Sequence, residues 1–388
     1  MTISDLPTPA LLIEQSRLQA NLTAMQAQAD ANDVALRPHT KTHKSVALAN
    51  EQRNRGAEGL TVATVKEAET FIDAGFDDVR VAYPVTGRNK HERLRALRAD
   101  SKISFTVDTV AGADQASAVY AEADIPVDVL IEVDVGHGRC GVHWADDAAA
   151  VTLARRIASL PGLTLAGILT HAGQAYSGPS NGETEADALR RASRQERDRM
   201  LSVASALAEA DGVNVTPDNF EISVGSTPSM AAFENAEHDG FRITEMRPRN
   251  DGMHDAIQVA LGAASLTDCA LTVLTTVVST QQKPDGTTHA FVDAGKKVFT
   301  TDTGYGTDGH GIALADAATM RAHPGLHVDH LSEEHGWLTV SGDATLTVGD
   351  RLHIVPNHAC VTVANQDQLY VVDGDAVVDT WGVDARGW

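Results

Sequence analysis

Residues 34–44 of this 388-residue chain are Val34-Ala35-Leu36-Arg37-Pro38-His39-Thr40-Lys41-Thr42-His43-Lys44. The apolar start of this segment predicts a buried strand, and Lys41 follows where that strand ends. Burial of a lysine there lowers the pKa of its amine and makes the amine a nucleophile, as a Schiff-base lysine requires. The alternative is a basic surface loop. Lysine is scarce, with eight residues against 23 arginines, yet two of the eight lie in this segment.

The same segment opens a regular alternation of predicted strands and helices. Each strand but the last is followed by a helical pattern, and the strands cover residues 34–38, 59–64, 78–83, 101–107, 127–135, 163–170, 219–224 and 241–246. Strands that alternate with helices indicate a parallel sheet. Eight of them in roughly 250 residues fit a (β/α)8 barrel, with an open doubly wound sheet as the alternative.

The sequence pattern changes after Gly262, where the long helical patterns end. Short predicted strands follow at residues 269–279, 289–293, 326–330, 337–340, 351–355, 361–363 and 368–373. We therefore expect an α/β protein, with a (β/α)8 TIM barrel over residues 14–262 and a C-terminal β domain over residues 263–388. An early strand at residues 8–13 is expected to join the β domain, and Ser16 to cap the helix after it.

Charge and composition exclude several classes of partner. The net charge of −22 argues against binding to nucleic acids or anionic membranes, because their phosphates would be repelled. No apolar run reaches the length of a membrane span, and the N-terminus lacks the features of a signal peptide, so we expect a cytoplasmic protein. Cys140, Cys269 and Cys360 are too few and too scattered for a disulfide framework.

Active sites of (β/α)8 barrels form at the carboxyl ends of the strands. The residues at those ends are Lys41, Thr64, Tyr83, Asp108, Arg139, His171, Ser226, Thr227 and Arg247. One lysine nucleophile and two arginines at the same end of the barrel suit an anionic cofactor, because their positive charges attract it. The segment Gly225-Ser226-Thr227-Pro228 opens a helix, where backbone N–H groups and two hydroxyls can hold a phosphate. An ordinary Ser/Thr helix cap is the alternative.

His358 and Cys360 form a candidate metal-binding pair in the predicted β domain. On an extended strand the two side chains of a His-x-Cys pair point to the same face. One imidazole and one thiolate favour zinc, and two protein ligands leave positions open for water or substrate. The alternative is two half-buried strand residues without a ligand.

Several of these motifs, in this order, resemble those of the D-serine dehydratase and D-threonine aldolase family of alanine-racemase-like, fold-type III pyridoxal-phosphate enzymes. The resemblance covers nearly the whole chain, from Thr8-Pro9 through the lysine segment to Pro356-Asn357-His358. It implies a barrel followed by a β domain. It also implies a head-to-tail homodimer in which the β domain of one chain closes the barrel site of the other.

The resemblance also implies roles for individual residues. Lys41 would carry pyridoxal 5'-phosphate, and Gly225-Ser226-Thr227 would hold the cofactor phosphate. His171 would lie against the pyridine ring, and Tyr176 would line the site. Arg139 would contact the ring oxygen of the cofactor or the carboxylate of the substrate.

The metal pair indicates the reaction. D-serine dehydratases carry His-x-Cys at this position and D-threonine aldolases typically carry His-x-Asp, so Cys360 favours the dehydratase. The resemblance thus implies a lyase of β-hydroxy D-amino acids. Lys41 would remove the α-proton of D-serine, and a divalent metal at His358 and Cys360 would help the hydroxyl leave, giving pyruvate and ammonia. Zinc is the expected metal, with manganese or magnesium as alternatives.

Other activities remain open at this point. A D-threonine aldolase would cleave its substrate to glycine and an aldehyde with the same cofactor and metal. An amino-acid racemase would need a catalytic tyrosine, for which Tyr305 and Tyr370 are the candidates. Barrel proteins that bind pyridoxal phosphate without catalysis lack a β domain. Family members often carry a second histidine where this chain has Gln174, which leaves the proton relay open.

Overall fold

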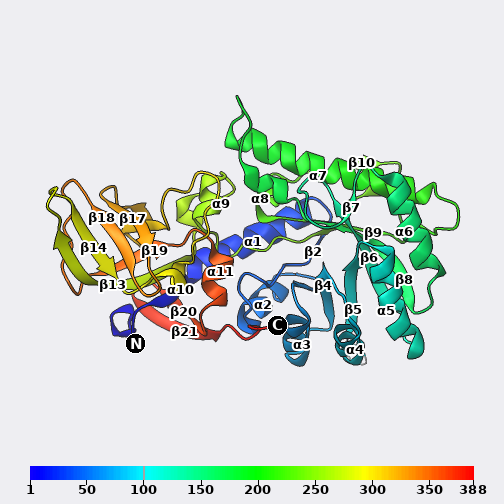
Figure 1. Ribbon diagram of the computed structural model, residues 1–388, viewed down its shortest axis with the longest axis horizontal. Coiled ribbons are helices and arrows are strands. Elements are labelled where there is room, and N and C mark those ends of the chain that lie inside the picture. The colour runs from blue at the N-terminus through cyan, green and yellow to red at the C-terminus, as the bar shows by residue number, and fades with distance from the viewer. Residues whose placement is uncertain (99–100) are drawn as a thin grey trace.

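The computed structural model describes residues 1–98 and 101–388. Figure 1 shows a barrel of strands ringed by helices on one side and a β-rich part on the other, with helix α1 (Gln15–Ala31) between them. This architecture confirms the expected TIM barrel followed by a β domain. The exact domain limits at residues 14, 262 and 263 stay a prediction.

Eight parallel strands form the barrel, in the spatial order β2-β12-β9-β8-β6-β5-β4-β3. Their bounds are Ala35–Leu36 (β2), Leu60–Val62 (β3), Asp78–Pro84 (β4), Lys102–Val107 (β5), Val127–Asp134 (β6), Leu163–Thr170 (β8), Glu221–Val224 (β9) and Glu245–Met246 (β12). The ring closes between β2 and β3. There the Thr40 amide donates to the Thr61 carbonyl and the Thr61 amide donates to the Pro38 carbonyl, each at 2.9 Å. The open-sheet alternative is therefore wrong.

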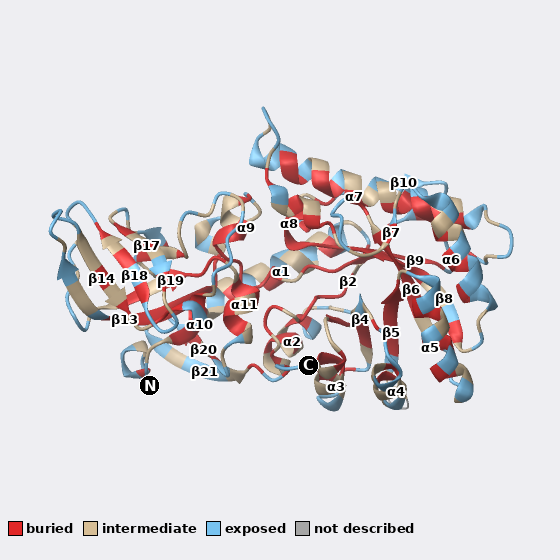
Figure 2. Ribbon diagram, viewed as in Figure 1, coloured by how far each residue is buried: buried red, intermediate tan, exposed pale blue. Residues whose placement is uncertain are grey.

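Helices cover the outside of the barrel. They are α2 (Val46–Arg53), α3 (Val65–Asp73), α4 (Arg88–Leu97), α5 (Val110–Glu122), α6 (Asp147–Ser159), α7 (Glu185–Ala208) and α8 (Thr227–Met230). Helix α3 shows why: Val65, Ala68 and Phe71 recur at helical spacing and are buried against the strands. Its first turn is capped by the Thr64 hydroxyl, which accepts from the Glu67 amide at 3.1 Å. Figure 2 shows the resulting pattern of buried strands and exposed outer helix faces.

The barrel interior contains a buried network of charged side chains. Arg80, which is 1% exposed, donates to Glu221 and to Glu245, the latter at 2.6 Å. Arg37 donates to Glu245 at 2.5 Å and to Asp78 at 2.6 Å. Buried charges are stable only when each has its partner, because desolvation is costly. The network therefore fixes strands β2, β4, β9 and β12 relative to one another, and through Arg37 it anchors the start of the segment that carries Lys41.

A second, larger sheet makes up the β-rich part. Its strands are β1 (Ala10–Glu14), β13 (Leu271–Gln282), β14 (Thr288–Val292), β15 (Ile312–Asp316), β16 (Arg321–Ala322), β17 (Leu326–Leu331), β18 (Gly336–Val340), β19 (Arg351–Val355), β20 (Gln368–Asp373) and β21 (Ala376–Gly382). The N-terminal strand β1 lies between β13 and β20. Leu12 is opposite Thr272 of antiparallel β13 and opposite Tyr370 of parallel β20. The first and last segments of the chain thus build one sheet.

Some local expectations are wrong. The predicted strand at 361–363 lies inside helix α11 (Ala359–Ala364). The predicted strand at 241–246 is interrupted: β11 (Phe241–Arg242) forms a hairpin with β10 (Glu237–His238), and only β12 joins the barrel. The cap of α1 is Glu14, whose carboxylate accepts from the Arg17 amide at 2.8 Å, and not Ser16. None of the helices within the described residues is both long and apolar enough to cross a membrane.

Candidate active site

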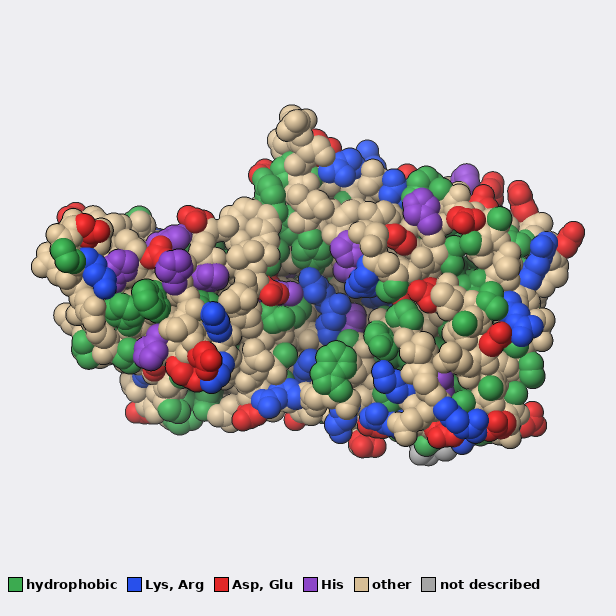
Figure 3. Space-filling view, viewed as in Figure 1, with side chains coloured by type: hydrophobic (Ala, Val, Ile, Leu, Met, Phe, Trp, Pro, Cys, Tyr) green, Lys and Arg blue, Asp and Glu red, His purple; other side chains and the backbone are tan. Residues whose placement is uncertain are grey.

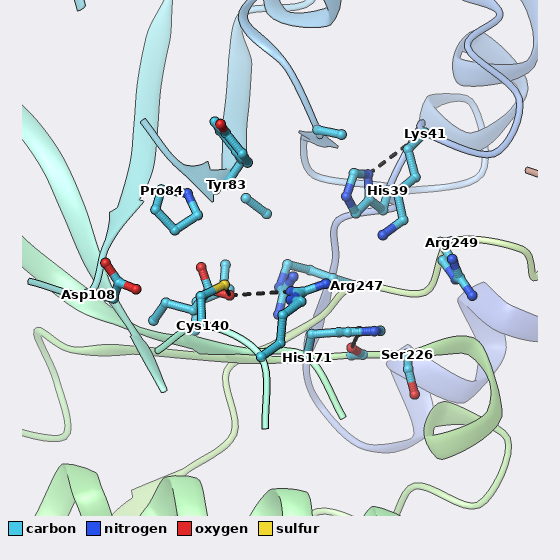
Figure 4. Close-up of a pocket in the computed structure, with 16 residues that line it drawn as sticks. His39, Lys41, Tyr83, Pro84, Asp108, Cys140, His171, Ser226, Arg247 and Arg249 are labelled. Atoms are coloured by element: carbon cyan, nitrogen blue, oxygen red, sulfur yellow. Dashed lines mark hydrogen bonds and ion pairs between the residues drawn. The ribbon is translucent and has the colours of Figure 1, made fainter. Parts of the chain in front are cut away.

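A cavity of about 490 Å³ opens at the carboxyl ends of the barrel strands. Its lining residues are His39, Lys41, Ala63, Ala82, Tyr83, Pro84, Asp108, Glu132, Arg139, Cys140, Leu169, His171, Gly225, Ser226, Arg247 and Arg249. Figure 3 shows basic side chains and histidines gathered in the hollow between the two parts of the molecule. Figure 4 places Lys41, Arg249 and Ser226 toward one end of the cavity and Asp108 and Pro84 toward the other. The volume is typical of a site for a small molecule.

Lys41 lies where the first barrel strand ends, as the sequence predicts, and it lines the cavity. Desolvation, and next the positive charge of Arg249, lower the pKa of its amine to about 7. A large fraction of the amine is therefore uncharged near neutral pH and able to act as a nucleophile or a base. The Lys41 amide donates to His39 Nδ1 at 3.4 Å, which fixes the start of the turn.

His171 follows strand β8 and also lines the cavity. Its Nδ1 donates to the Gly225 carbonyl at 3.2 Å, so that Nε2 keeps its lone pair. Desolvation and the charges of Lys41 and Arg249 hold its pKa well below the ordinary value. The ring is therefore neutral and can pack against another ring without a cost in charge.

The loop that carries Arg139 is held by a ring of hydrogen bonds. The Asp134 carboxylate accepts from the amides of Gly136, His137 and Gly138 at 2.8–3.0 Å. Gly141 closes the turn with φ +115°, and a Cβ there would lie 2.7 Å from the Asp134 amide nitrogen.

Arg139 is presented by this loop at the cavity edge. Its side chain is 50% exposed, and its guanidinium lies 3.4 Å from the Glu132 carboxylate. Because half of the side chain is exposed and the contact with Glu132 is long, Arg139 can also bind an anion that enters the cavity.

The three residues predicted to hold a phosphate differ in position. Ser226 and Gly225 line the cavity, whereas Thr227 does not. The Thr227 hydroxyl accepts from the amides of Arg249 and Asn250 at 3.1 and 2.8 Å, so it braces the neighbouring loop. A Cβ on Gly225 would lie 2.6 Å from a backbone oxygen of the facing strand end, which explains the glycine.

A buried carboxylate supports this phosphate-loop candidate from behind. Glu196 of α7 is 0% exposed and accepts from the Gly225 amide at 2.8 Å and from the Ser229 hydroxyl at 2.7 Å. The Ser229 hydroxyl in turn lies 2.9 Å from that of Ser226. The Gly225 amide is therefore already engaged, and Ser226 is the member of the predicted triplet left to face a ligand.

Tyr176 lies behind the cavity wall. Its hydroxyl accepts from Arg249 Nε at 3.1 Å, and the Arg249 guanidinium stacks 4.9 Å from the centre of its ring. Tyr176 thus orients an arginine that does line the cavity. Gln174 occupies the position where family members often carry a second histidine. Its side-chain amide donates to the Val135 carbonyl at 3.3 Å.

His358 and Cys360 begin helix α11 and do not sit on an extended strand, which corrects the expectation from sequence. The Cys360 thiol is buried and lies 2.9 Å from the Thr42 hydroxyl, next to Lys41 in the chain. His358 Nδ1 lies 2.8 Å from an Asp302 carboxylate oxygen. Its Nε2 is buried without a hydrogen-bond partner in the described part of the chain.

The electrostatics of this pair suit a cation. Burial alone would raise the pKa of Cys360, but Arg249 and His358 outweigh it and lower the value to about 6. Burial would lower the pKa of His358, but the Cys360 thiolate raises it to about 9. A divalent ion could take the place of the imidazolium proton beside the thiolate. Among residues 1–98 and 101–388, no group of three or more His, Cys, Asp or Glu side chains is arranged to hold a metal.

Four residues of the site were missed from the sequence: Arg249, Glu132, Glu196 and Asp302. Arg249 lies two residues beyond the strand-end residue Arg247, so a longer reading of that strand end would have included it. Glu132 belongs to β6 and faces the cavity. Glu196 and Asp302 lie in a helix and a loop without any sequence signal, and only the fold brings them to the site.

The chain is similar to known proteins over nearly its whole length. The chain matches the family models "Alanine racemase, N-terminal domain" over residues 13–248 and "Putative serine dehydratase domain" over residues 270–372. It is 34% identical to D-threo-3-hydroxyaspartate dehydratase of Delftia sp. (strain HT23) over 98% of both chains. It is 35% identical to D-threonine aldolase of Arthrobacter sp. over 98% of this chain and 93% of that protein. Identity to D-serine dehydratase of Schizosaccharomyces pombe is 25%, over 100% of this chain and 93% of that protein.

Solved structures give the same result. The D-threo-3-hydroxyaspartate dehydratase from Delftia sp. HT23 matches with a TM-score of 0.87 at 33% identity and covers 100% of both chains. A cysteine-to-alanine variant of that enzyme, in the metal-free form, matches with a TM-score of 0.89. The sequence, the fold and the placement of the barrel lysine all lead to one assignment. The chain belongs to the D-serine dehydratase and D-threonine aldolase family of alanine-racemase-like, pyridoxal-phosphate-dependent enzymes.

Proposed function

We propose that this protein is a pyridoxal-phosphate- and metal-dependent lyase that removes water from a β-hydroxy D-amino acid, with D-serine as the first substrate. One observation carries the proposal. The thiol of Cys360 contacts the hydroxyl of Thr42 at 2.9 Å, which brings the metal pair beside the barrel lysine, Lys41. A base for the α-proton and a site for a Lewis acid thus share one cavity, which is what a β-elimination requires.

The cavity fits pyridoxal phosphate. About half of the Lys41 amine is uncharged at pH 7, so Lys41 would carry the cofactor. The neutral ring of His171 would lie against the pyridine ring, and Ser226 would contribute to holding the phosphate, with Thr227 bracing the loop behind it. When bound, this cofactor supplies an electron sink for the charge left at the α-carbon.

The metal pair fits zinc better than a harder ion. His358 Nε2 is a buried nitrogen without a partner among the described residues, and the thiolate of Cys360 is a soft ligand. A solved relative in which a cysteine is replaced by alanine is in the metal-free form, which supports a cysteine ligand in this family. Manganese and magnesium are the alternatives. Two protein ligands would leave positions open toward a substrate hydroxyl.

The residues of the chain would act in sequence. Arg139, half-exposed at the cavity edge, would bind the substrate carboxylate and orient the α-carbon. Lys41 would then take the α-proton on its amine. The β-hydroxyl would leave on the side of His358 and Cys360, where a bound metal ion supplies a Lewis acid. The products from D-serine would be pyruvate and ammonia.

D-threonine aldolase is the second candidate. The observation that favours it is the 35% identity to such an enzyme over 98% of this chain. Cys360 favours dehydration, because aldolases of the family typically carry an aspartate there. A racemase would need a tyrosine at the cavity, and neither Tyr305 nor Tyr370 of the same chain lines it.

We also propose a homodimer, as the family resemblance implies. The metal pair already meets Lys41 of its own chain, so the partner would close the cavity and would not supply His358 or Cys360. Multi-angle light scattering of the purified protein would test this. The cytoplasmic location stays a prediction.

One assay separates the candidate reactions. Purified protein with cofactor and zinc is given D-serine, D-threonine, D-threo-3-hydroxyaspartate and their L-forms. Dehydration would give pyruvate, 2-oxobutanoate and oxaloacetate, whereas aldol cleavage of threonine would give glycine and acetaldehyde. Cys360→Ala should lose dehydration, and Cys140→Ala, which changes a half-buried thiol of the same cavity, should retain it. Turnover of only L-forms, or none of any substrate, would reject the proposal.

A further inference from the structure

Asp302 lies in the loop after helix α10 (Lys296–Phe299) and contacts His358 of the candidate metal pair. Its carboxylate oxygen is 2.8 Å from His358 Nδ1. Because a carboxylate only accepts hydrogen bonds, the hydrogen of this bond belongs to Nδ1. The other ring nitrogen, Nε2, is buried and has no hydrogen-bond partner in the described part of the chain.

This arrangement assigns different tasks to the two nitrogens. A histidine that ligates a metal through one nitrogen commonly donates its other N–H to a carboxylate, which fixes the tautomer and makes the ligand more basic. In this chain Nδ1 is committed to Asp302, which leaves Nε2 as the nitrogen on which a divalent ion could replace a proton.

The loop is built to keep Asp302 in place. Asn357, the residue before His358, donates through its side-chain amide to the carbonyls of Asp302 at 3.0 Å and Gly309 at 2.8 Å. Asn357 is itself buried. One buried amide thus ties the segment that supplies the carboxylate to the segment that supplies the imidazole, so that the two move together.

We propose that Asp302 is a positioning residue for the metal site: it holds His358 with its proton on Nδ1 and presents Nε2 to a divalent ion shared with Cys360. This rests on the proposed function, which places the metal at His358 and Cys360. Asp302 itself would not touch the ion. Its effect would be to pre-orient the imidazole and to stabilise positive charge on it once the ion is bound.

The test measures zinc affinity and does not depend on turnover. Zinc is titrated into the metal-free full-length protein against a chromophoric chelator. Loss of such a supporting carboxylate typically weakens metal binding by about 10–100-fold, so Asp302→Ala should fall in that range. Asp302→Asn keeps an amide oxygen that can accept from Nδ1, so it should recover part of the loss. Asn357→Ala, which frees the loop, should also weaken binding.

Asp308→Ala is the matched control. Asp308 lies in the same loop and also pairs with an imidazole, His327, at 3.1 Å, but it is 91% exposed. The Asp308→Ala variant should therefore have the same zinc affinity as the wild type. Thermal unfolding of the metal-free proteins should be similar for Asp302→Ala and Asp308→Ala, which separates positioning from general loss of structure.

The outcomes separate this proposal from the proposed function. If Cys360→Ala abolishes zinc binding while Asp302→Ala leaves it intact, the metal site stands and the role of Asp302 is rejected. If Cys360→Ala also binds zinc normally, the metal assignment itself fails. Should Asp302→Ala not fold, long-range ¹H–¹⁵N NMR of the zinc-loaded wild type decides: a proton on His358 Nδ1 supports the proposal, and a proton on Nε2 overturns it.

Discussion

The pH at which Lys41 loses its proton can be predicted from the cavity. Burial, and next the charge of Arg249, lower the pKa of the Lys41 amine from 10.5 to about 7. At pH 7 about half of the amine is then uncharged, whereas an ordinary lysine would have about three uncharged amines in ten thousand. The population able to attack an aldehyde is therefore larger by about a thousandfold.

Attachment of the cofactor reports this population directly. Cofactor-free protein is mixed with excess pyridoxal phosphate, and the visible absorbance of the lysine-bound form is followed between pH 5.5 and 9.5. The rate should rise with pH and reach half of its plateau near pH 7. Lys41→Ala should form no borohydride-reducible adduct, while Lys44→Ala should keep it.

A substitution tests the second cause of the shift. Arg249→Met removes the cation that lowers the pKa of Lys41 most, so the midpoint should move to higher pH. Arg53→Met is the matched control, because Arg53 also stacks on an aromatic ring, Phe76, at 4.4 Å but is no part of the cavity. A wild-type rate that rises only above pH 9 would refute the reasoning, as would an Arg249→Met midpoint at or below that of the wild type.

Three further outcomes are expected. Replacing Ser226 and Thr227 together by alanine should weaken binding of pyridoxal phosphate far more than binding of pyridoxal, by about 1.5–3 kcal/mol for the Ser226 hydrogen bond to the anion and further because Thr227 no longer braces the loop; equal losses for both ligands would reject this loop. A chelator should remove the metal without lowering the unfolding temperature, and activity should return with zinc; joint loss of activity and stability would indicate a structural metal. In urea unfolding, Glu245→Gln should cost about 3 kcal/mol, as expected from a carboxyl pKa that the facing arginines lower, against burial, from 4.5 to about 2. This stabilisation is complete above pH 4.5 and lost as pH falls toward 2, so a loss below 1 kcal/mol at neutral pH would contradict it.

The barrel could be predicted because its signals are local. Segments such as 102–107 and 127–134 are short apolar runs separated by helical patterns, and such alternation allows few topologies. The error at Val361-Thr362-Val363 has a physical cause. β-branched residues favour strands, but a run of three is too short to distinguish a strand from a buried helical turn. Here tertiary packing of α11 against the barrel segment at Thr42 decides.

The active site also contains residues that could be predicted from the sequence and residues that could not. Lys41, Arg139 and His171 could be predicted because the carboxyl ends of parallel strands meet at one edge, whatever the loops between them. Asp302 and Glu196 could not, since each acts through another residue and no spacing in the sequence connects them to it. A residue that orients a functional group has to lie close to that group in the fold, and the sequence alone does not give this distance.

The position of strand β1 has a consequence for how the protein is made. Residues 10–14 leave the ribosome before the barrel strands, yet Leu12 pairs with Thr272 and with Tyr370, which leave it much later. The barrel can form while the chain is still growing, because domains fold as units and the N-terminal one folds first. Strand β1 can pair only after β13 and β20 have been synthesised. This pairing closes a loop that spans most of the chain, which slows formation of the sheet.

Completion of the sheet is therefore a late event in biosynthesis. The helix with His358 and Cys360 precedes β20 by only a few residues, so the metal pair reaches Lys41 at the same stage. A nascent chain should form the site around the reactive lysine early. It should add the candidate metal pair only when synthesis is almost finished. Ribosome-bound chains stalled before residue 350 should accordingly bind cofactor but remain inactive.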